Sequence, residues 1–214
     1  MTGSRRWPAT AWRTLLELTL PALDGLGPGA EWSLGGGTAL ALKIHHRISY
    51  DIDIFLEDAG HLRALSPARN AATRAIAESW QEPGHYLKLE RAEGAIDFIV
   101  AARLTDLAPW LYRFKERDVP VEEPGEILAK KLKYRGSRLA ARDIFDILAV
   151  HRADPAAVRA AVAAVPDGAR RAADRIRHME KRYRDTIGDE VNPTASGMEI
   201  LEIDPLRAAE ILSG

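Results

Sequence analysis

One segment in the first quarter of the chain constrains the fold most, because it combines a strand, a tight turn, a helix and a second strand. A short apolar run at residues 32–34 leads into Gly35-Gly36-Gly37, and residues 38–44 are rich in good helix formers. Residues 50–56 then alternate between polar and apolar side chains, which is typical of a half-buried strand. We expect Thr38 to cap the helix N-terminus. The segment predicts an α+β fold, with a mixed sheet and flanking helices.

Apolar spacing elsewhere predicts further elements of the same kinds. Residues 10–20 carry apolar side chains at helical spacing, and Pro21 is expected to interrupt that helix. Another helix is expected at residues 67–80. Residues 86–90 and 95–101 are expected to form a hairpin. These elements would supply the remaining strands and the outer helices of the sheet.

The pattern changes from strands to helices near Pro120 and Pro124. Pro124 suits the first position of a helix, because a proline there loses no hydrogen bond. We therefore divide the chain into a mixed-sheet core at residues 1–123 and a helical C-terminal region at residues 124–214. Helices of this region are expected at residues 124–134, 138–151, from 155 onward, at 167–184 and after Asp204-Pro205, with a loop at 192–197.

Composition limits the chemistry and the location that we expect. The chain has 214 residues, 46% of them apolar, so it can bury a sizeable core. It has no cysteine, which removes disulfides and thiolate metal sites and fits a reducing compartment. Residues 1–8 are basic but carry no leader pattern, and no apolar run approaches the roughly 18 residues of a membrane span. We expect a cytoplasmic protein without a membrane partner.

Charge is distributed unevenly, although the formal net charge is only −1. Residues 127–142 carry six basic side chains and no acid until Asp143 follows, and residues 170–184 form a second basic cluster. Charged faces of amphipathic helices are commonly just solvated, and this interpretation is favoured for the second cluster. The first cluster lies closer to the other candidate residues.

The glycine turn has two interpretations. Glycines before a helix let the backbone approach a phosphate, and the free N–H groups of the helix favour the negative charge. Many tight turns between a strand and a helix use glycine without any ligand. The turn is neither a Walker A loop nor a dinucleotide fingerprint, because the required spacing is missing. Taken alone it decides little.

The acids downstream change that balance. Asp51 and Asp53 are one strand period apart, so they would share a face while Ile52 and Ile54 point into the core. A third acid, Asp97, lies in another apolar strand, where a lone buried carboxylate would be costly. Neighbouring carboxylates repel each other unless a cation joins them. Oxygen ligands at close quarters suit Mg²⁺ or Mn²⁺, which can assist chemistry on a phosphate.

Several stretches resemble one family of enzymes. The runs Gly-Gly-Gly-Thr-Ala-Leu-Ala-Leu-Lys at 35–43 and His-Arg-Ile-Ser-Tyr-Asp-Ile-Asp-Ile-Phe at 46–55 resemble the first motif of the AbiEii/AbiGii toxin nucleotidyltransferases, in the DNA polymerase β-like superfamily. Residues 126–132, 135–136 and 142–148 resemble the later lysine and Arg-Asp-x-x-Asp motifs. The resemblance spans about residues 34–148 and implies a nucleotidyltransferase core in the first part of the chain.

The resemblance implies roles for individual residues. Gly37 and Thr38 stand where the superfamily usually has Gly-Ser, and Thr38 keeps the hydroxyl. The resemblance makes Asp51 and Asp53 metal ligands. Asp97, chosen from its strand context, would be the third acid. The remaining implied or inferred site residues are Lys131 at the nucleoside triphosphate, Asp146 in support of the site, and Gly36, Arg47 and Ser49 near the phosphates.

Some assignments keep alternatives. Lys130 competes with Lys131 for the phosphate, and the spacing of the family motif favours Lys131. Asp143 is either a site residue or an ion-pair partner of Arg135 or Arg142. Ser49 is equally well a turn residue. The pair His45-His46 lacks the i,i+4 spacing of helical metal sites, so we expect no metal there.

The sequence therefore predicts transfer of a nucleoside monophosphate from a nucleoside triphosphate to a hydroxyl, with a divalent cation as cofactor. The resemblance implies an RNA acceptor, with the tRNA 3′ end as one candidate, but members of the wider superfamily also modify proteins or small molecules, so the acceptor stays open. The resemblance also implies the toxin of a toxin–antitoxin or phage-defence pair, with a cognate antitoxin as partner. The rival is a non-catalytic nucleotide-binding or partner-binding module on the same fold. A metal-dependent phosphohydrolase is less favoured, because its usual histidines or nucleophilic Asp motif are missing.

Overall fold

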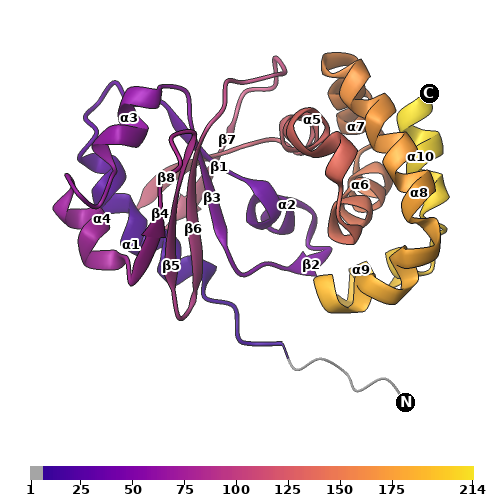
Figure 1. Ribbon diagram of the computed structural model, residues 1–214, viewed down its shortest axis with the longest axis horizontal. Helices are drawn as coiled ribbons and strands as arrows, with labels where there is room; N and C mark the ends of the chain where they lie inside the picture. Colours follow the sequence, from indigo (N-terminus) through magenta and orange to yellow (C-terminus); the bar gives the residue numbers. More distant parts are fainter. Residues whose placement is uncertain (1–6) are drawn as a thin grey trace.

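Residues 7–214, the part of the chain that the computed structural model describes, contain a seven-stranded mixed sheet (Figure 1). The strand order across it is β4-β5-β6-β3-β1-β8-β7. Two pairs of neighbours, β1 with β8 and β3 with β6, are parallel, and the others are antiparallel. The predicted α+β class is confirmed. The strands are β1 (Trp32–Gly35), β3 (Ile52–Leu56), β4 (Ser79–Gln81), β5 (Tyr86–Arg91), β6 (Gly94–Val100), β7 (Trp110–Phe114) and β8 (Arg117–Val121).

Helices cover both faces of the sheet, as Figure 1 shows. Helices α1, α3 and α4 lie on one face, while α2 lies on the other, between the sheet and the C-terminal helices. A short second sheet joins β2 (Arg47–Ile48) to β9 (Asn192–Pro193). The helices are α1 (Trp12–Asp24), α2 (Gly36–Ile44), α3 (Ala59–Ala64), α4 (Ala71–Ile76), α5 (Pro124–Arg135), the 3-10 turn η1 (Gly136–Arg138), α6 (Ala141–Ala153), α7 (Pro155–Ala164), α8 (Pro166–Glu190), α9 (Ala195–Leu201) and α10 (Leu206–Ser213).

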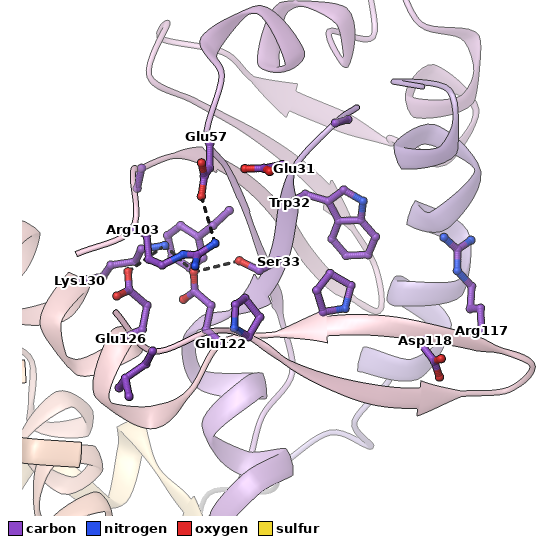
Figure 2. A pocket seen from close by; sticks show the side chains of 16 residues that line it. Glu31, Trp32, Ser33, Glu57, Arg103, Arg117, Asp118, Glu122, Glu126 and Lys130 are labelled. Atoms are coloured by element: carbon purple, nitrogen blue, oxygen red, sulfur yellow. Dashed lines mark hydrogen bonds and ion pairs between the residues drawn. The ribbon is translucent and has the colours of Figure 1, made fainter. Parts of the chain in front are cut away.

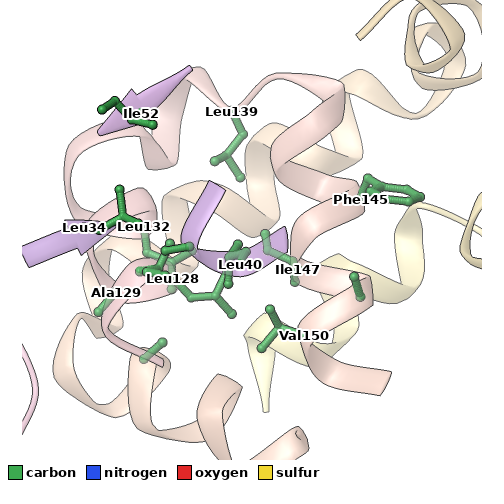
Figure 3. Packing of buried hydrophobic residues seen from close by; sticks show 14 of the residues in the cluster. Leu34, Leu40, Ile52, Leu128, Ala129, Leu132, Leu139, Phe145, Ile147 and Val150 are labelled. Carbon is green, nitrogen blue, oxygen red and sulfur yellow. The ribbon is translucent and has the colours of Figure 1, made fainter. Parts of the chain in front are cut away.

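Helix α2 links the sheet to the C-terminal helices through its apolar side chains. Leu40 is fully buried and lies among Leu128 of α5 and Ile147 of α6 (Figure 3). The same cluster of buried side chains includes Leu34 of β1 and Ile52 of β3. The two predicted regions thus share one core. Their division at residues 123 and 124, between the end of β8 and the start of α5, stays a proposal about domain organisation.

Two helix predictions in the N-terminal region are wrong. Pro21 does not end α1, which continues to Asp24, because a proline near the C-terminus removes only one hydrogen bond and the Gly25 N–H still bonds to the Pro21 carbonyl at 3.2 Å. The single helix expected at 67–80 is replaced by α4 and the edge strand β4, with α3 preceding them. The Asn70 side chain caps α4 and sets where that helix begins.

Of two hairpins in the main sheet, β5 with β6 and β7 with β8, only the first was expected. The hairpin of β5 and β6 is confirmed, and its turn lies just before Gly94, whose φ of 144° favours glycine. The hairpin of β7 and β8 has no counterpart among the elements expected from the sequence. Pro120 is tolerated in β8 because the register of β8 with β1 is limited to Val121 opposite Leu34, so a missing N–H beside that short pairing costs little.

The C-terminal helices follow the sequence more closely. Helix α5 begins with Pro124 at its first position, as expected, and the Asp154 carboxylate caps α7. Helix α8 extends beyond the expected range to Glu190. The loop expected at 192–197 instead contains β9 and the start of α9. The pairing of β9 with β2 is a long-range contact that local sequence does not reveal.

Two observations concern membrane-spanning helices and the N-terminus. No helix within residues 7–214 has the length and apolar character needed to cross a bilayer. The expectation that the basic N-terminus carries no leader concerns residues that, up to position 6, lie outside the described part of the chain.

Candidate active site

A cavity of about 540 Å³ opens between the sheet and helix α5. It is lined by the N-terminus of α2, by strands β3, β5 and β6, and by α5, η1 and the start of α6. Thr38 and Asp146 do not line it but contact residues that do. The other eight of the ten predicted site residues line this cavity: Gly36, Gly37, Arg47, Ser49, Asp51, Asp53, Asp97 and Lys131.

Gly36 and Gly37 are required in the turn because other side chains lie very close to their backbone. Gly36 has a φ of 63°, and a Cβ on it would lie 1.9 Å from Oδ2 of Asp53. A Cβ on Gly37 would lie 2.3 Å from Nη2 of Arg47. Side chains of the site therefore pack directly against this backbone. Helix α2 begins at Gly36, so its free N–H groups face the same cavity.

Replacement of Gly36 by Ala tests this close approach. We expect Gly36→Ala to lower activity by about a hundredfold, because the added methyl group must displace the Asp53 carboxylate, and to cost about 1–3 kcal/mol of unfolding free energy. The measurements are a transfer assay and thermal unfolding. Gly27→Ala is the matched control, because Gly27 also has a positive φ, 91°, but has open space around it. Similar activity losses in both variants would contradict the close-approach argument.

The expected capping role of Thr38 is wrong. Helix α2 starts two residues earlier, with Gly35 at the cap position and no side-chain cap. The Thr38 hydroxyl is almost completely buried and donates instead to the backbone carbonyl of Asp51. Thr38 thus holds the acid-bearing segment against α2, and its predicted contact with the nucleotide stays a prediction.

The register of the sheet brings the acids together. Asp53 on β3 lies opposite Asp97 on the parallel strand β6 and opposite Gly35 on β1. Asp51 precedes β3, and its Oδ1 accepts a hydrogen bond from the Ala95 N–H at 2.8 Å. Burial, together with the charge of Asp97, raises the pKa of Asp53 to about 6. The carboxylates are therefore adjacent and electrostatically unfavourable by themselves.

Asp97 forms an ion pair with a lysine. Lys88, its neighbour on β5, places Nζ 3.3 Å from Oδ2 of Asp97. Burial raises the pKa of Asp97, and the Lys88 ammonium opposes that rise. Sequence reasoning missed Lys88, although its position opposite Asp97 follows from the correctly predicted hairpin.

A divalent cation fits part of this arrangement. Among residues 7–214, no three or more His, Cys, Asp or Glu side chains are gathered as a ready metal site. Mg²⁺ in nucleotide enzymes is commonly held by only one or two carboxylates together with the substrate phosphates. Asp51 and Asp53 supply such oxygen ligands, and a cation would relieve the repulsion that raises the pKa of Asp53. The three-acid ligand set stays a prediction.

Asp146 is the centre of a buried network behind the cavity. It is fully buried, and Arg47 donates to both of its oxygens, from Nε at 2.8 Å and Nη2 at 3.2 Å. His46 Nε2 lies 2.8 Å from Oδ1, and Lys131 Nζ lies 2.9 Å from Oδ2. Arg47 and Lys131 hold the pKa of Asp146 well below its usual range. Asp146 orients the basic side chains that line the cavity.

The two lysines of α5 have separate environments. Lys131 bonds to Asp146 and, at 2.5 Å, to Asp143, and these acids raise its pKa despite its burial. Lys130 also lines the cavity, but it pairs with Glu122 and lies over the Phe55 ring, 3.9 Å from the centroid. Lys131 is thus the lysine that belongs to the network of Asp146.

Two further predictions concern neighbours of this network. Asp143 pairs with Lys131 and lies 3.8 Å from Arg135, so the ion-pair interpretation with Arg135 is correct and the contact with Lys131 joins it to the site. Of the two adjacent histidines, His46 is 2% exposed and contacts an acid 100 residues away. No local signal could have identified that contact.

Basic side chains surround the acids. Arg135, Arg138 and Arg142 are exposed and line the cavity from η1 and its flanking helices. Five of the six basic residues of the first cluster, all but Lys133, therefore line the cavity that holds the acids. The second cluster, on α8, includes exposed pairs with acids one turn away, such as Arg170 with Asp167 and Arg177 with Asp174, as a solvated helix face does.

The seven-stranded mixed sheet with helices on both faces is a fold shared with solved nucleotidyltransferase structures. The structure is similar to MenT4, a nucleotidyltransferase toxin from Mycobacterium tuberculosis H37Rv, with a TM-score of 0.50 and 17% identity over 94% of this chain and 82% of that one. It is also similar to a protein from H. pylori described provisionally as a nucleotidyltransferase, with a TM-score of 0.50 and 16% identity over 96% and 93% of the two chains. At such identities the likeness shows the fold alone.

The chain belongs to the AbiEii nucleotidyltransferase toxin family of type IV toxin–antitoxin systems, whose family model matches residues 22–209. This match confirms the family resemblance found in the sequence and extends it beyond residue 148. No curated protein is similar enough to the chain to match it.

Proposed function

We propose that this protein transfers a nucleoside monophosphate from a nucleoside triphosphate to a hydroxyl acceptor, with release of pyrophosphate. The observation that carries the proposal is the placement of Asp51 and Asp53 in one cavity with the N-terminus of α2 and with Lys131. Acids suited to a cation and groups suited to phosphate thus face each other. Membership of a nucleotidyltransferase toxin family supports the same reaction.

Each side chain has a role in this proposal. Asp51 and Asp53 would hold Mg²⁺ or Mn²⁺, which when bound supplies charge stabilisation at the transferring phosphate. The backbone N–H groups of Gly36 and Gly37 would donate hydrogen bonds to phosphate oxygens at the start of α2. The remaining phosphate contacts would come from Lys131, Arg47 and Ser49, with Asp146 and Thr38 as positioning residues.

Asp97 would act on the acceptor. Burial raises its pKa, which makes its carboxylate a better proton acceptor. In the proposed step the acceptor oxygen bonds to the α-phosphorus while the bond from that phosphorus to the bridging oxygen of the β-phosphate breaks. The hydroxyl proton passes to Asp97, and pyrophosphate leaves.

For the acceptor we propose an RNA, with the tRNA 3′ end as the first candidate. The exposed Arg135, Arg138 and Arg142 at the rim of the cavity support this choice, because a phosphate backbone needs such partners. The family supports a role as the toxin of a toxin–antitoxin pair. A cognate antitoxin, a contribution to phage defence and a cytoplasmic location complete the proposal.

The test uses each of the four nucleoside triphosphates, labelled at the α-phosphate, with Mg²⁺ and total RNA. We expect labelled RNA with at least one of them. Asp51→Asn should reduce labelling about a thousandfold, because loss of a cation ligand removes several kcal/mol of stabilisation. Asp167→Asn removes an exposed carboxylate on α8 that does not line the cavity, and it is the control.

Equal labelling by Asp51→Asn and the wild type would contradict the proposal. Mg²⁺-dependent binding of a nucleotide by the wild type, without labelled product for any of the four, would favour the non-catalytic module instead.

A further inference from the structure

The cavity of the candidate active site has an apolar end to which the proposed reaction assigns no role. On its sheet side Asp53 lies opposite Asp97, and two residues further along the same strands Phe55 lies opposite Ile99. Residues two apart on a strand share a face, with Cα atoms roughly 7 Å apart. The ribose of a nucleotide separates its base from its α-phosphate by a comparable distance. A nucleotide with its α-phosphate at the acids therefore reaches the apolar end with its base.

Helix α5 faces the same cavity with two adjacent rows of side chains. One row is basic and has the spacing i, i+4, i+7: Lys131, Arg135 and Arg138. The other row has the spacing i, i+3, i+7: Ile127, Lys130 and Tyr134. Lys130 pairs with Glu122, next to Ser33 of β1, in a second cavity of about 390 Å³ beside the first (Figure 2). The second row therefore offers a ligand in the first cavity the side chains of Ile127 and Tyr134.

The ring of Tyr134 is accessible. Its side chain lines the cavity and is nevertheless 46% exposed. The nearby ammonium of Lys133 lies 5.9 Å from the centroid of the ring, at the outer limit of a cation–π contact, so it does not cover the ring. Phe55 and His85 also line the cavity, but Lys130 covers the Phe55 ring and His85 already packs edge to face on Tyr86.

Tyr134 leans back along α5, as long side chains of helices do. Partial burial raises the pKa of its hydroxyl, and the Glu126 carboxylate, two turns earlier on α5, adds to that rise. One side of the ring therefore rests on the helix, and the other side is open to the cavity. Across the cavity, Ile99 and Val100 of β6 are only partly buried. A flat ring bound here would have an aromatic face on one side and aliphatic surface on the other.

We propose that Tyr134 stacks on a nucleobase at the apolar end of the active-site cavity. Stacking on an aromatic side chain tolerates any base, because every base has a π-face. Tyr134 would thus add affinity without selecting among the four bases. This inference rests on the proposed function, because that function brings nucleotides to the cavity. Two sources share the chemistry: the base of the nucleoside triphosphate and the terminal base of an RNA acceptor.

Tyr134→Ala and Tyr134→Phe test the ring and the hydroxyl separately. Calorimetry gives the Kd of each of the four nucleoside triphosphates with Mg²⁺, and filter binding gives the Kd of total tRNA. We expect Tyr134→Ala to weaken one of these two kinds of ligand about tenfold or more, and the weakened ligand is the source of the base. Tyr134→Phe keeps the ring and should bind within about twofold of the wild type. Unchanged binding of both ligands in Tyr134→Ala, or an equal loss in both variants, would overturn the inference.

The control is Leu111→Ala. Leu111 is 65% exposed on the edge strand β7 and lines neither cavity, so its truncation removes exposed apolar surface without touching the site. It should leave both Kd values unchanged. Thermal unfolding of all three variants checks that each is folded under the conditions of the binding measurements.

A fluorescent base reports stacking directly, because the emission of 2-aminopurine is quenched when it stacks on an aromatic ring. The two probes are 2-aminopurine riboside triphosphate and a tRNA that carries 2-aminopurine as its 3′-terminal base. The wild type and Tyr134→Phe should quench the probe whose base occupies the site, and Tyr134→Ala at saturating protein should not. No quenching of either probe by the wild type, or equal quenching by Tyr134→Ala, would contradict stacking on Tyr134.

These measurements are independent of catalysis. Quenching that depends on Tyr134, without transfer of any nucleotide, would uphold this inference while contradicting the proposed function. Transfer activity with the same KM for triphosphate and for RNA in Tyr134→Ala as in the wild type would do the reverse.

Discussion

Asp53→Asn is expected to abolish transfer while it stabilises the cation-free protein. Activity should fall about a thousandfold, because the variant loses a ligand of the proposed cation. The pKa of Asp53 rises from 3.8 to about 6 in the folded chain, which corresponds to roughly 3 kcal/mol of differential stability. Since the side chain keeps some contact with water, we expect a gain of about 2 kcal/mol at neutral pH.

The pH dependence of that gain follows from the direction of the shift. A carboxyl whose pKa is raised in the folded state destabilises the fold once it is charged, so the penalty grows as the pH rises from about 4 to 6. Thermal unfolding of the wild type and Asp53→Asn should coincide near pH 4 and separate by pH 7. A variant that is less stable than the wild type at pH 7 without metal would contradict this electrostatic account.

Asp146→Ala is expected to have the largest effect on stability. It would leave Arg47, Lys131 and His46 buried without their shared acid, and breaking a buried ion-pair network by removal of one partner costs about 3–5 kcal/mol. Denaturant unfolding gives the free energy. Transfer activity should fall as well, because Lys131 and Arg47 lose the acid that orients them.

The control for this variant is Asp174→Ala, because Asp174 also pairs with an arginine but is 61% exposed. Its cost should stay within about 1 kcal/mol, as for other surface ion pairs. A loss of less than about 1 kcal/mol in Asp146→Ala would mean that the three basic side chains find other partners or water, and that Asp146 does not organise the site.

Short-range patterns predicted the part of the site that the chain builds locally. The spacing of Gly36 from Asp53 reflects one strand–helix–strand unit, and the reason for the glycine is the Asp53 carboxylate that packs against it. The alternation that placed Ile52 and Ile54 in the core is confirmed, because both are fully buried. Asp97 could be expected near Asp53 only if their strands were neighbours, and the structure provides that pairing.

Contacts between distant segments were not predictable in this way. The contact of His46 with Asp146 joins residues 100 positions apart, and a histidine just after the end of a helix gives no sign of such a partner. The parallel pairing of β8 with β1 likewise depends on the whole sheet. The N-terminus of α2 was misplaced because the glycines suited a turn by local propensity, whereas close packing against Asp53 and Arg47 allows them to begin the helix.

The most direct test of nucleotidyl transfer compares two labels in one triphosphate. The wild-type chain is incubated with Mg²⁺, RNA and its preferred nucleoside triphosphate, labelled either at the α-phosphate or at the γ-phosphate. Our account predicts that the α-label enters the RNA and the γ-label leaves as pyrophosphate. Transfer of the γ-label to the acceptor, or its release as inorganic phosphate with no α-label in RNA, would contradict it.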